Sequence, residues 1–359
     1  MPKRNANDGS TSVARPVSLK TLAEHLGLST ATISAVVNDT PKGRQFPQST
    51  RDLILKAAKE FDYRPNYLAR SLRQRRTHTA AVIVQEISEG YAASILSSIE
   101  RRLVQEGYLY FVAAHRGDAR LIDDYPRLLL QRAVEGFILV NTPLRRELPV
   151  PVVSIAAGSQ VKGNTRILLD NARGCQLALA HLASRGHREI AFFKGHPRSG
   201  DTQPRWEGIC RAAQELGLVV RPELTVQLHG LSGDSEPSTP EEGYEYARQL
   251  LQRKKPFTAL FAFNDISAIG AISALRDAGL RVPQDVSVVG FDDIRSAAFQ
   301  NPRLTTVRQP LEQMGELAAS ILLQRIADPE NAPEAITVEP ELMVRESTSE
   351  VLTQAATRS

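Results

Sequence analysis

The chain has little cysteine, little tryptophan and no long hydrophobic run. Its 359 residues include two cysteines and one tryptophan. Two cysteines cannot form a disulfide framework for a chain of this length, so we expect a reducing compartment, the cytoplasm. No apolar run approaches the ~18 residues of a membrane span. Residues 1–16 lack the apolar segment of a secretory signal.

Patterns typical of enzymes and metal sites are also missing. The seven histidines show no metal-ligand spacing. No glycine-rich phosphate-binding loop occurs, and we cannot assemble a nucleophile with a base. We therefore expect no enzyme activity, no cofactor and no metal. Gly186 and His187 directly follow a predicted helix over 172–184, which favours a C-cap and a structural histidine.

Charge is distributed unevenly along the sequence. Residues 1–78 contain 14 Lys+Arg and 6 Asp+Glu, a net charge of +8. The remaining residues contain 30 and 34, a net charge of −4. A small basic head on a mildly acidic body indicates contact with a polyanion. The alternative from charge alone is a solubilising tail.

The pattern of residues divides the chain into five stretches. Residues 1–16 have no periodicity and predict a flexible arm. Residues 17–63 carry three short helical patterns, and 64–76 form a cationic linker. Residues 77–347 alternate between β-rich runs and amphipathic helices, and 348–359 are expected to fray. Length alone, at ~100–200 residues per domain, predicts two or three domains.

The long alternating body predicts parallel sheets covered by helices on both faces. About 270 residues exceed one comfortable core. We therefore expect an α/β body of two Rossmann-like lobes, the first over about 79–171 and 310–339, the second over about 172–309 and 340–347. Ligands bind beyond the carboxyl ends of such strands, which here places the site in the cleft between the lobes.

Residues 18–38 predict a helix-turn-helix. Leu22 and its apolar neighbours share one face of a first helix, Gly27 permits a turn, and Ser29 is a suitable N-cap for a second helix. The outward side chains of the second helix are small and polar, which suits a major groove. A third helix is predicted from a capping box at Ser49 and is expected to pack four residues inward, namely Leu53, Ile54, Ala57 and Phe61. The alternative is an ordinary three-helix bundle.

The order of these motifs resembles the lac-repressor/galactose-repressor (LacI/GalR) family of bacterial transcription regulators. The resemblance covers residues 18 to about 347. The matching segments are 21–23, 27–29, 31–34, 36–38, 50–51, 63–66, 68–72, 170–171, 181–182, 186–188, 264–265, 281–283, 288–293, 304–310 and 344–347.

The resemblance implies a helix-turn-helix head joined to a periplasmic-binding-protein-like body. It implies a cytoplasmic homodimer that binds a pseudo-palindromic operator, acts as a repressor and responds to a small metabolite, a sugar or related polyol. The rival is a periplasmic-type sugar-binding protein without a regulatory role, and a second rival is an enzyme acting on sugars or nucleosides. No membrane partner is expected.

The resemblance also implies which residues contact DNA. Residues 66–72, within the linker over 64–76, resemble the family's hinge helix, which orders on DNA. Leu72 matches a leucine wedged into the minor groove, where an apolar side chain partly unstacks a base step. From the residues alone, a hydrophobic contact in a linker would be preferred for Leu72. The expected DNA contacts are Ser29, Thr30, Ala31, Thr32, Ser34, Ala35, Asn38, Asn66, Ala69, Arg70 and Leu72.

Two features of the head depart from the sequence pattern of the family. Ala35 stands where an arginine is common, and alanine cannot read guanine through paired hydrogen bonds. The loop over 39–49 is a few residues longer than usual. Its Lys42 and Arg44 either add phosphate contacts or lie in a solvated loop.

Four effector contacts follow from the resemblance. Asp292 is expected to accept hydrogen bonds from ligand hydroxyls, and Arg205 to donate. Asn264 is expected to donate and accept, and Tyr91 to stack on a ring. The alternatives are that Arg205 pairs with an acid and that Asp292 caps a turn.

The expected apolar wall of the cleft departs from the family. Small or aliphatic residues replace bulkier ones, which predicts a wider or differently shaped pocket. The single tryptophan, Trp206, either compensates or packs elsewhere. The replaced positions are Ala92, Ala156, Ala157 and Leu231.

Overall fold

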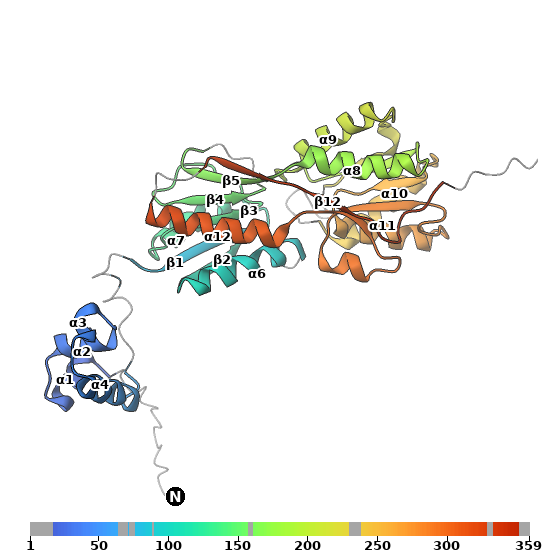
Figure 1. Cartoon of the computed structure of the whole chain (residues 1–359). Helices are drawn as coiled ribbons and strands as arrows, with labels where there is room; N and C mark the ends of the chain where they lie inside the picture. Colours follow the sequence, from blue (N-terminus) through green and yellow to red (C-terminus); the bar gives the residue numbers. More distant parts are fainter. Residues whose placement is uncertain are drawn as a thin grey trace, which may run out of the picture. The chain divides into compact units, whose positions relative to one another are not determined.

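The computed structural model describes residues 17–63, 71, 76–87, 90–156, 161–229, 238–328 and 333–351. The chain forms two compact units, a head that ends at Thr77 and a body that begins at His78 (Figure 1). Several residues singled out in the sequence lie outside the described residues, namely Asn66, Ala69, Arg70, Leu72, Ala157 and Leu231.

The head is helical throughout its regular structure. The helices are α1 (Leu19–Leu26), α2 (Thr30–Val37), α3 (Pro41–Arg44) and α4 (Gln48–Glu60). Ser18 and Ser29 cap α1 and α2, and each hydroxyl accepts a hydrogen bond from the backbone N–H three residues on. Gly27 separates the two helices at φ 63°, a conformation that favours glycine. The predicted helix-turn-helix is confirmed.

The rest of the head differs from the sequence prediction in three places. Helix α4 begins at Gln48 after Pro47 and has no side-chain cap, so the capping box predicted at Ser49 is wrong. Of the residues expected to face inward, Ile54 and Ala57 are buried as predicted, whereas Leu53 is 51% exposed. The loop over 39–49 contains helix α3.

The first lobe of the body is a parallel six-stranded sheet with the order β11-β5-β4-β3-β1-β2. Its strands are β1 (Thr79–Val84), β2 (Leu109–Ala114), β3 (Phe137–Val140), β4 (Val152–Ile155), β5 (Asn164–Leu169) and β11 (Ala335–Val338). Helices α6 (Gly90–Gln105) and α12 (Leu311–Ala327) pack side by side over one face. Helix α7 (Ala119–Leu130) covers the other.

The second lobe repeats this plan with the order β12-β10-β9-β8-β6-β7, in which only β12 is antiparallel to its neighbour among the described strands. Its strands are β6 (Ile190–Lys194), β7 (Thr225–Gln227), β8 (Ala259–Phe261), β9 (Ser287–Asp292), β10 (Thr305–Arg308) and β12 (Glu341–Met343). Its helices are α8 (Asn171–Ser184), α9 (Thr202–Glu215), α10 (Pro240–Gln252) and α11 (Asp265–Asp277), with short 3-10 turns η1 (Pro222–Leu224) and η2 (Arg295–Phe299). The predicted α/β fold class is confirmed.

The chain passes between the two sheets three times: from β5 to α8, from β10 to α12, and from β11 to β12. Parallel strands end at one edge of their sheet, so residues that directly follow strands of the two lobes are brought towards the junction. None of the described helices has the length and hydropathy of a membrane span.

The expectation that the chain frays from residue 348 is wrong for its first residues. The hydroxyl of Thr348 lies 2.9 Å from Nε2 of His181. The carbonyl of Ser349 lies 3.0 Å from Nε2 of His187, whose Nδ1 lies 2.9 Å from the hydroxyl of Thr258. His187 therefore fastens the end of the chain to the second lobe, consistent with a structural histidine.

Helices α10 and α11 approach so closely that only glycine fits at their crossing. A Cβ atom added to Gly270 would lie 1.8 Å from the carbonyl oxygen of Pro240. Overpacking of this kind costs about 1–3 kcal/mol. We therefore expect Gly270→Ala to lower the urea midpoint of the full chain. Ser273→Ala, at an exposed position of the same helix, is the matched control; equal midpoints for the two variants would contradict this packing argument.

Candidate functional site

The predicted groove-reading residues of the head gather on one surface. Ser29, Thr30 and Ala31 are exposed at the start of α2. The remaining described candidates are half-buried, namely Thr32, Ser34, Ala35 and Asn38. A single surface hollow is lined by Leu19, Ser29, Thr30, Ala31, Thr32, Ser34, Ala35, Thr40, Lys42 and Phe46. Six of the seven described candidates therefore lie together.

Asn38 is the candidate that does not line this hollow. It is the C-cap of α2, and its Nδ2 donates to the carbonyl oxygen of Ser34 at 2.7 Å. Its Oδ1 is buried and has no hydrogen-bond partner among the described residues. Asn38 thus terminates the helix.

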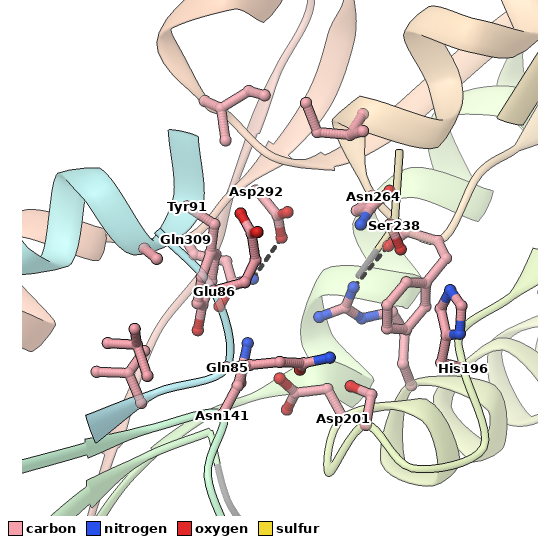
Figure 2. A pocket seen from close by; sticks show the side chains of 18 residues that line it. Gln85, Glu86, Tyr91, Asn141, His196, Asp201, Ser238, Asn264, Asp292 and Gln309 are labelled. Carbon is pink, nitrogen blue, oxygen red and sulfur yellow. Dashed lines mark hydrogen bonds between the residues drawn. The ribbon is translucent and has the colours of Figure 1, made fainter. Parts of the chain in front are cut away.

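The body contains a cavity at the junction of the two lobes, with an empty volume of about 810 Å³ including space open to solvent (Figure 2). It is lined by Val84, Gln85, Glu86, Tyr91, Ala92, Val140, Asn141, His196, Ser199, Asp201, Arg205, Ser238, Phe263, Asn264, Ile266, Asp292, Ile294 and Gln309. The structure therefore brings together all four predicted effector contacts.

Arg205 is held rigidly in the first turns of α9. It is 3% exposed, its Nε donates to Oδ1 of Asn171 at 3.1 Å, and its Nη1 donates to the carbonyl oxygen of Phe263 at 2.6 Å. The guanidinium carbon lies 3.6 Å from the ring centroid of Phe291, a cation–π contact. No ion pair joins Arg205 to a carboxylate of the described residues. The alternative that Arg205 simply pairs with an acid is wrong within that part of the chain.

Asp292 ends β9 inside the cavity. It is 6% exposed, and its Oδ1 accepts a hydrogen bond from Nε2 of Gln309 at 2.6 Å (Figure 2). Burial raises its pKa to about 7, although Arg205 and the hydrogen bond from Gln309 act in the opposite direction. Its φ of 117° is rare for any residue but glycine. Such backbone strain is typical of functional sites.

Two further buried carboxyl groups surround Asp292. Asp201 precedes α9 and lines the cavity, and burial raises its pKa. Asp265 is not among the lining residues, and it accepts hydrogen bonds from the hydroxyl of Thr306 and the backbone N–H of Ile294. Burial, followed by the charge of Asp292, raises the pKa of Asp265. The site is therefore rich in carboxyl groups that are costly to ionise.

Asn264 and Tyr91 line the cavity with polar groups. Oδ1 of Asn264 caps α11 by accepting from the N–H of Ser267 at 3.0 Å. Its side-chain amide nitrogen remains to donate to a ligand, and Oδ1 keeps a second lone pair that can accept. The hydroxyl of Tyr91 is buried with no partner among the described residues, and burial raises its pKa well above the usual value.

Several cavity residues were missed by the sequence analysis. His196 follows β6, and its Nε2 lies 3.0 Å from Oε2 of the buried Glu242. Within the described part of the chain, Nδ1 of His196, Oδ1 of Asn141 and Oε1 of Gln309 are buried without partners. Buried polar atoms normally have hydrogen-bond partners, so these atoms indicate a polar ligand or water. The sequence could have indicated Asn141, because it directly follows β3 and ligands bind beyond the carboxyl ends of such strands.

The apolar wall is only partly as expected. Ala92 lines the cavity, whereas Ala156 is not among its lining residues. Trp206 packs edge-on against Phe192, with ring centroids 6.1 Å apart, and Nζ of Lys194 lies 4.6 Å from the tryptophan ring. Trp206 is therefore a packing residue and does not fill the space left by the alanines.

Together, the helix-turn-helix head and the two-lobed body with a polar cavity define the class of ligand-binding DNA regulators. Residues 179–348 match the periplasmic binding protein-like domain. The HTH-type transcriptional repressor PurR of Yersinia pestis bv. Antiqua (strain Antiqua) is 34% identical over 92% of this chain and 97% of its own length.

Solved structures agree with this relationship. The lac repressor dimer, bound to operator and the anti-inducer ONPF, matches with a TM-score of 0.83 and 25% identity over 93% of this chain and 100% of that chain. The regulator CelR in complex with cellobiose matches with a TM-score of 0.67 and 29% identity over 92% of this chain and 99% of that chain. The chain belongs to the LacI/GalR family of transcription regulators.

The raised pKa of Asp292 predicts a specific pH dependence of stability. Its folded-state pKa of about 7 exceeds the unfolded value of about 3.9, so folding favours the protonated form. This contribution is complete below the unfolded pKa and is lost as the pH rises through the folded one. We expect the stability of Asp292→Asn relative to wild type to increase as the pH rises from about 4 to about 8, because only wild type must ionise the buried carboxyl group.

Urea denaturation of both proteins across this pH range measures the difference. Asparagine preserves the shape and the acceptor oxygen that Gln309 contacts. If the unfolding free energies of the two proteins change with pH in parallel, Asp292 has the same pKa in the folded and the unfolded chain.

Proposed function

We propose that this protein is a cytoplasmic, homodimeric repressor that binds a pseudo-palindromic operator and senses a small polyhydroxylated metabolite in the cavity. The observation that carries this proposal is the cavity itself, lined by residues of both lobes in a chain of this family. The lac repressor structure, a dimer on operator DNA, and the CelR structure, which holds cellobiose, support the analogy. The protein acts by binding rather than by catalysis.

In the proposed complex, α2 enters the major groove. Its N-terminal residues are exposed, small and polar, which permits close approach to base edges. Asn66, Ala69 and Arg70 are proposed to contact DNA near the operator centre, where Leu72 is proposed to wedge into the minor groove. A second copy of the head would occupy the neighbouring half-site.

The effector is proposed to control DNA binding by stabilising one arrangement of the lobes. Tyr91 contributes from α6 of the first lobe, whereas Arg205 and Asp292 contribute from the second. A ligand that contacts both sides favours the lobe orientation in which all contacts are made. It changes DNA affinity only as far as it binds one state better than the other.

The charges of the cavity favour a neutral effector. Its described lining includes the carboxylates Glu86, Asp201 and Asp292 against the single guanidinium of Arg205. Ligand hydroxyls can both donate to and accept from such carboxyl groups, whereas an anionic ligand would oppose their ionisation in a poorly hydrated site. We therefore favour sugars and polyols over sugar acids.

The proposal is tested by selecting duplexes from a random pool with the full chain and measuring affinity with and without a panel of small molecules. The panel pairs neutral sugars with the corresponding sugar acids. We expect one pseudo-palindromic motif, bound by two copies, and an affinity that neutral members change and acids do not. A chain that selects no motif at any ligand state refutes the regulator assignment.

Arg205→Ala separates effector binding from DNA binding. The neutral sugar that most raises the melting temperature of wild type is expected to bind the variant at least ~10-fold more weakly, because a charged hydrogen-bond donor is lost. DNA affinity in the DNA-binding state is expected to persist. Trp206→Phe, at a position that does not line the cavity, is the control, and the sugar is expected to raise its melting temperature as it does for wild type. Equal stabilisation of Arg205→Ala and wild type would remove Arg205 from the site.

A further inference from the structure

Helix α3 is hydrogen-bonded through its N-cap to the second half of α2, the proposed recognition helix. The hydroxyl of Thr40 donates to the carbonyl oxygen of Ala35 at 3.1 Å and accepts from the N–H of Gly43 at 3.1 Å. The backbone N–H of Thr40 donates to the same carbonyl at 3.0 Å. One residue thus caps α3 and ties it to α2 at the position of Ala35.

Gly43 makes this close contact possible. A Cβ atom added there would lie 2.0 Å from the carbonyl oxygen of Ala35. The backbone of α3 therefore rests directly on α2. Because the contact is between backbones, the direction of α3 relative to α2 is well defined, unlike that of a solvated loop.

The two cations of α3 have different surroundings. Arg44 is engaged by Asp39, with Nε 3.2 Å from Oδ1 and Nη2 2.9 Å from Oδ2. Lys42 is exposed and has no ion-pair partner among the described residues. The ammonium of Lys42 is therefore available to an external acceptor.

Lys42 also lies on the proposed DNA-facing side of the head. It lines the same hollow as Thr32, Ser34 and Ala35 of α2. The methyl group of Ala35 can make no hydrogen bond to a base, and the neighbouring donors of α2 that line the hollow are the short hydroxyls of Thr32 and Ser34. Lysine supplies three donors on a long flexible stem, and such donors recognise the acceptors of a base edge.

We propose that Lys42 is a base-reading residue that donates from α3 to a base edge in the groove occupied by α2, beside Ala35. The inference rests on the proposed DNA binding and adds a specificity-determining position to it. A lysine that met only phosphates would behave differently, because phosphate contacts strengthen binding to every sequence alike.

The experiment selects duplexes from a random pool with the full-length wild type, Lys42→Ala and Lys42→Arg. We expect Lys42→Ala to lose the preference at one base pair of each half-site and to bind the wild-type motif ~5- to 150-fold more weakly per half-site. Lys42→Arg keeps the donor and is expected to retain a preference there. The matched control is Lys56→Ala, which removes an exposed cation paired with Glu60 on α4.

A second variant separates position from charge. Gly43→Ala keeps Lys42 but displaces α3 from Ala35, so it is expected to weaken the same base preference while circular dichroism shows a folded head. The proposal is overturned if Lys42→Ala selects the wild-type motif, or if it loses affinity equally for all duplexes with a smaller salt slope. A wild type that selects no motif would overturn the proposed function as well, which distinguishes the two failures.

Discussion

The buried guanidinium of Arg205 is the interaction on which the cavity depends. Taking a cation out of water is costly unless polar and π partners replace the lost hydration. Here the side-chain oxygen of Asn171, the carbonyl of Phe263 and the ring of Phe291 replace it. The resulting positive charge lowers the pKa values of Asp201 and Asp292 against the effect of burial. One fixed cation therefore lets two carboxyl groups remain at the junction of the lobes, ready to accept hydrogen bonds from a ligand.

The strand topology connects this charge cluster to the chain crossings. Asp292 contacts Gln309 twice, because the backbone N–H of Gln309 donates to the carbonyl of Asp292 at 3.3 Å and its side chain donates to Oδ1. Gln309 lies in the crossing between β10 and α12, which carries the chain from the second lobe back to the first. In the proposed mechanism, a ligand that binds Asp292 therefore acts next to a segment that joins the two lobes. This proximity gives a physical route from cavity to lobe orientation without a long relay of side chains.

Local patterns in the sequence predicted much of this arrangement. The apolar runs located the central strands of both sheets, and Ser29 located the start of α2, because capping is a local interaction. Arg205 and Asp292 were found through motif similarity. His196, Asn141 and Gln309 were missed because they belong to separate segments that only the fold brings together. Leu53 was misplaced because it is an apolar neighbour of Ile54, and only Ile54 lies on the same helix face as both buried alanines of α4.

The net charge of the head overstates the number of cations available to DNA. Within the described residues, Lys20 lies 3.8 Å from Glu24, Lys56 lies 3.9 Å from Glu60, and Arg44 is held by Asp39. Such exposed pairs add little stability, but they reduce the field that each cation presents to a phosphate. These ion pairs weaken the attraction of the head to phosphates of any DNA sequence. They do not weaken hydrogen bonds from a well-placed donor to a base edge. In the proposed complex, sequence preference therefore depends on where donors such as Lys42 lie around α2, and the backbone contact between Gly43 and Ala35 positions α3.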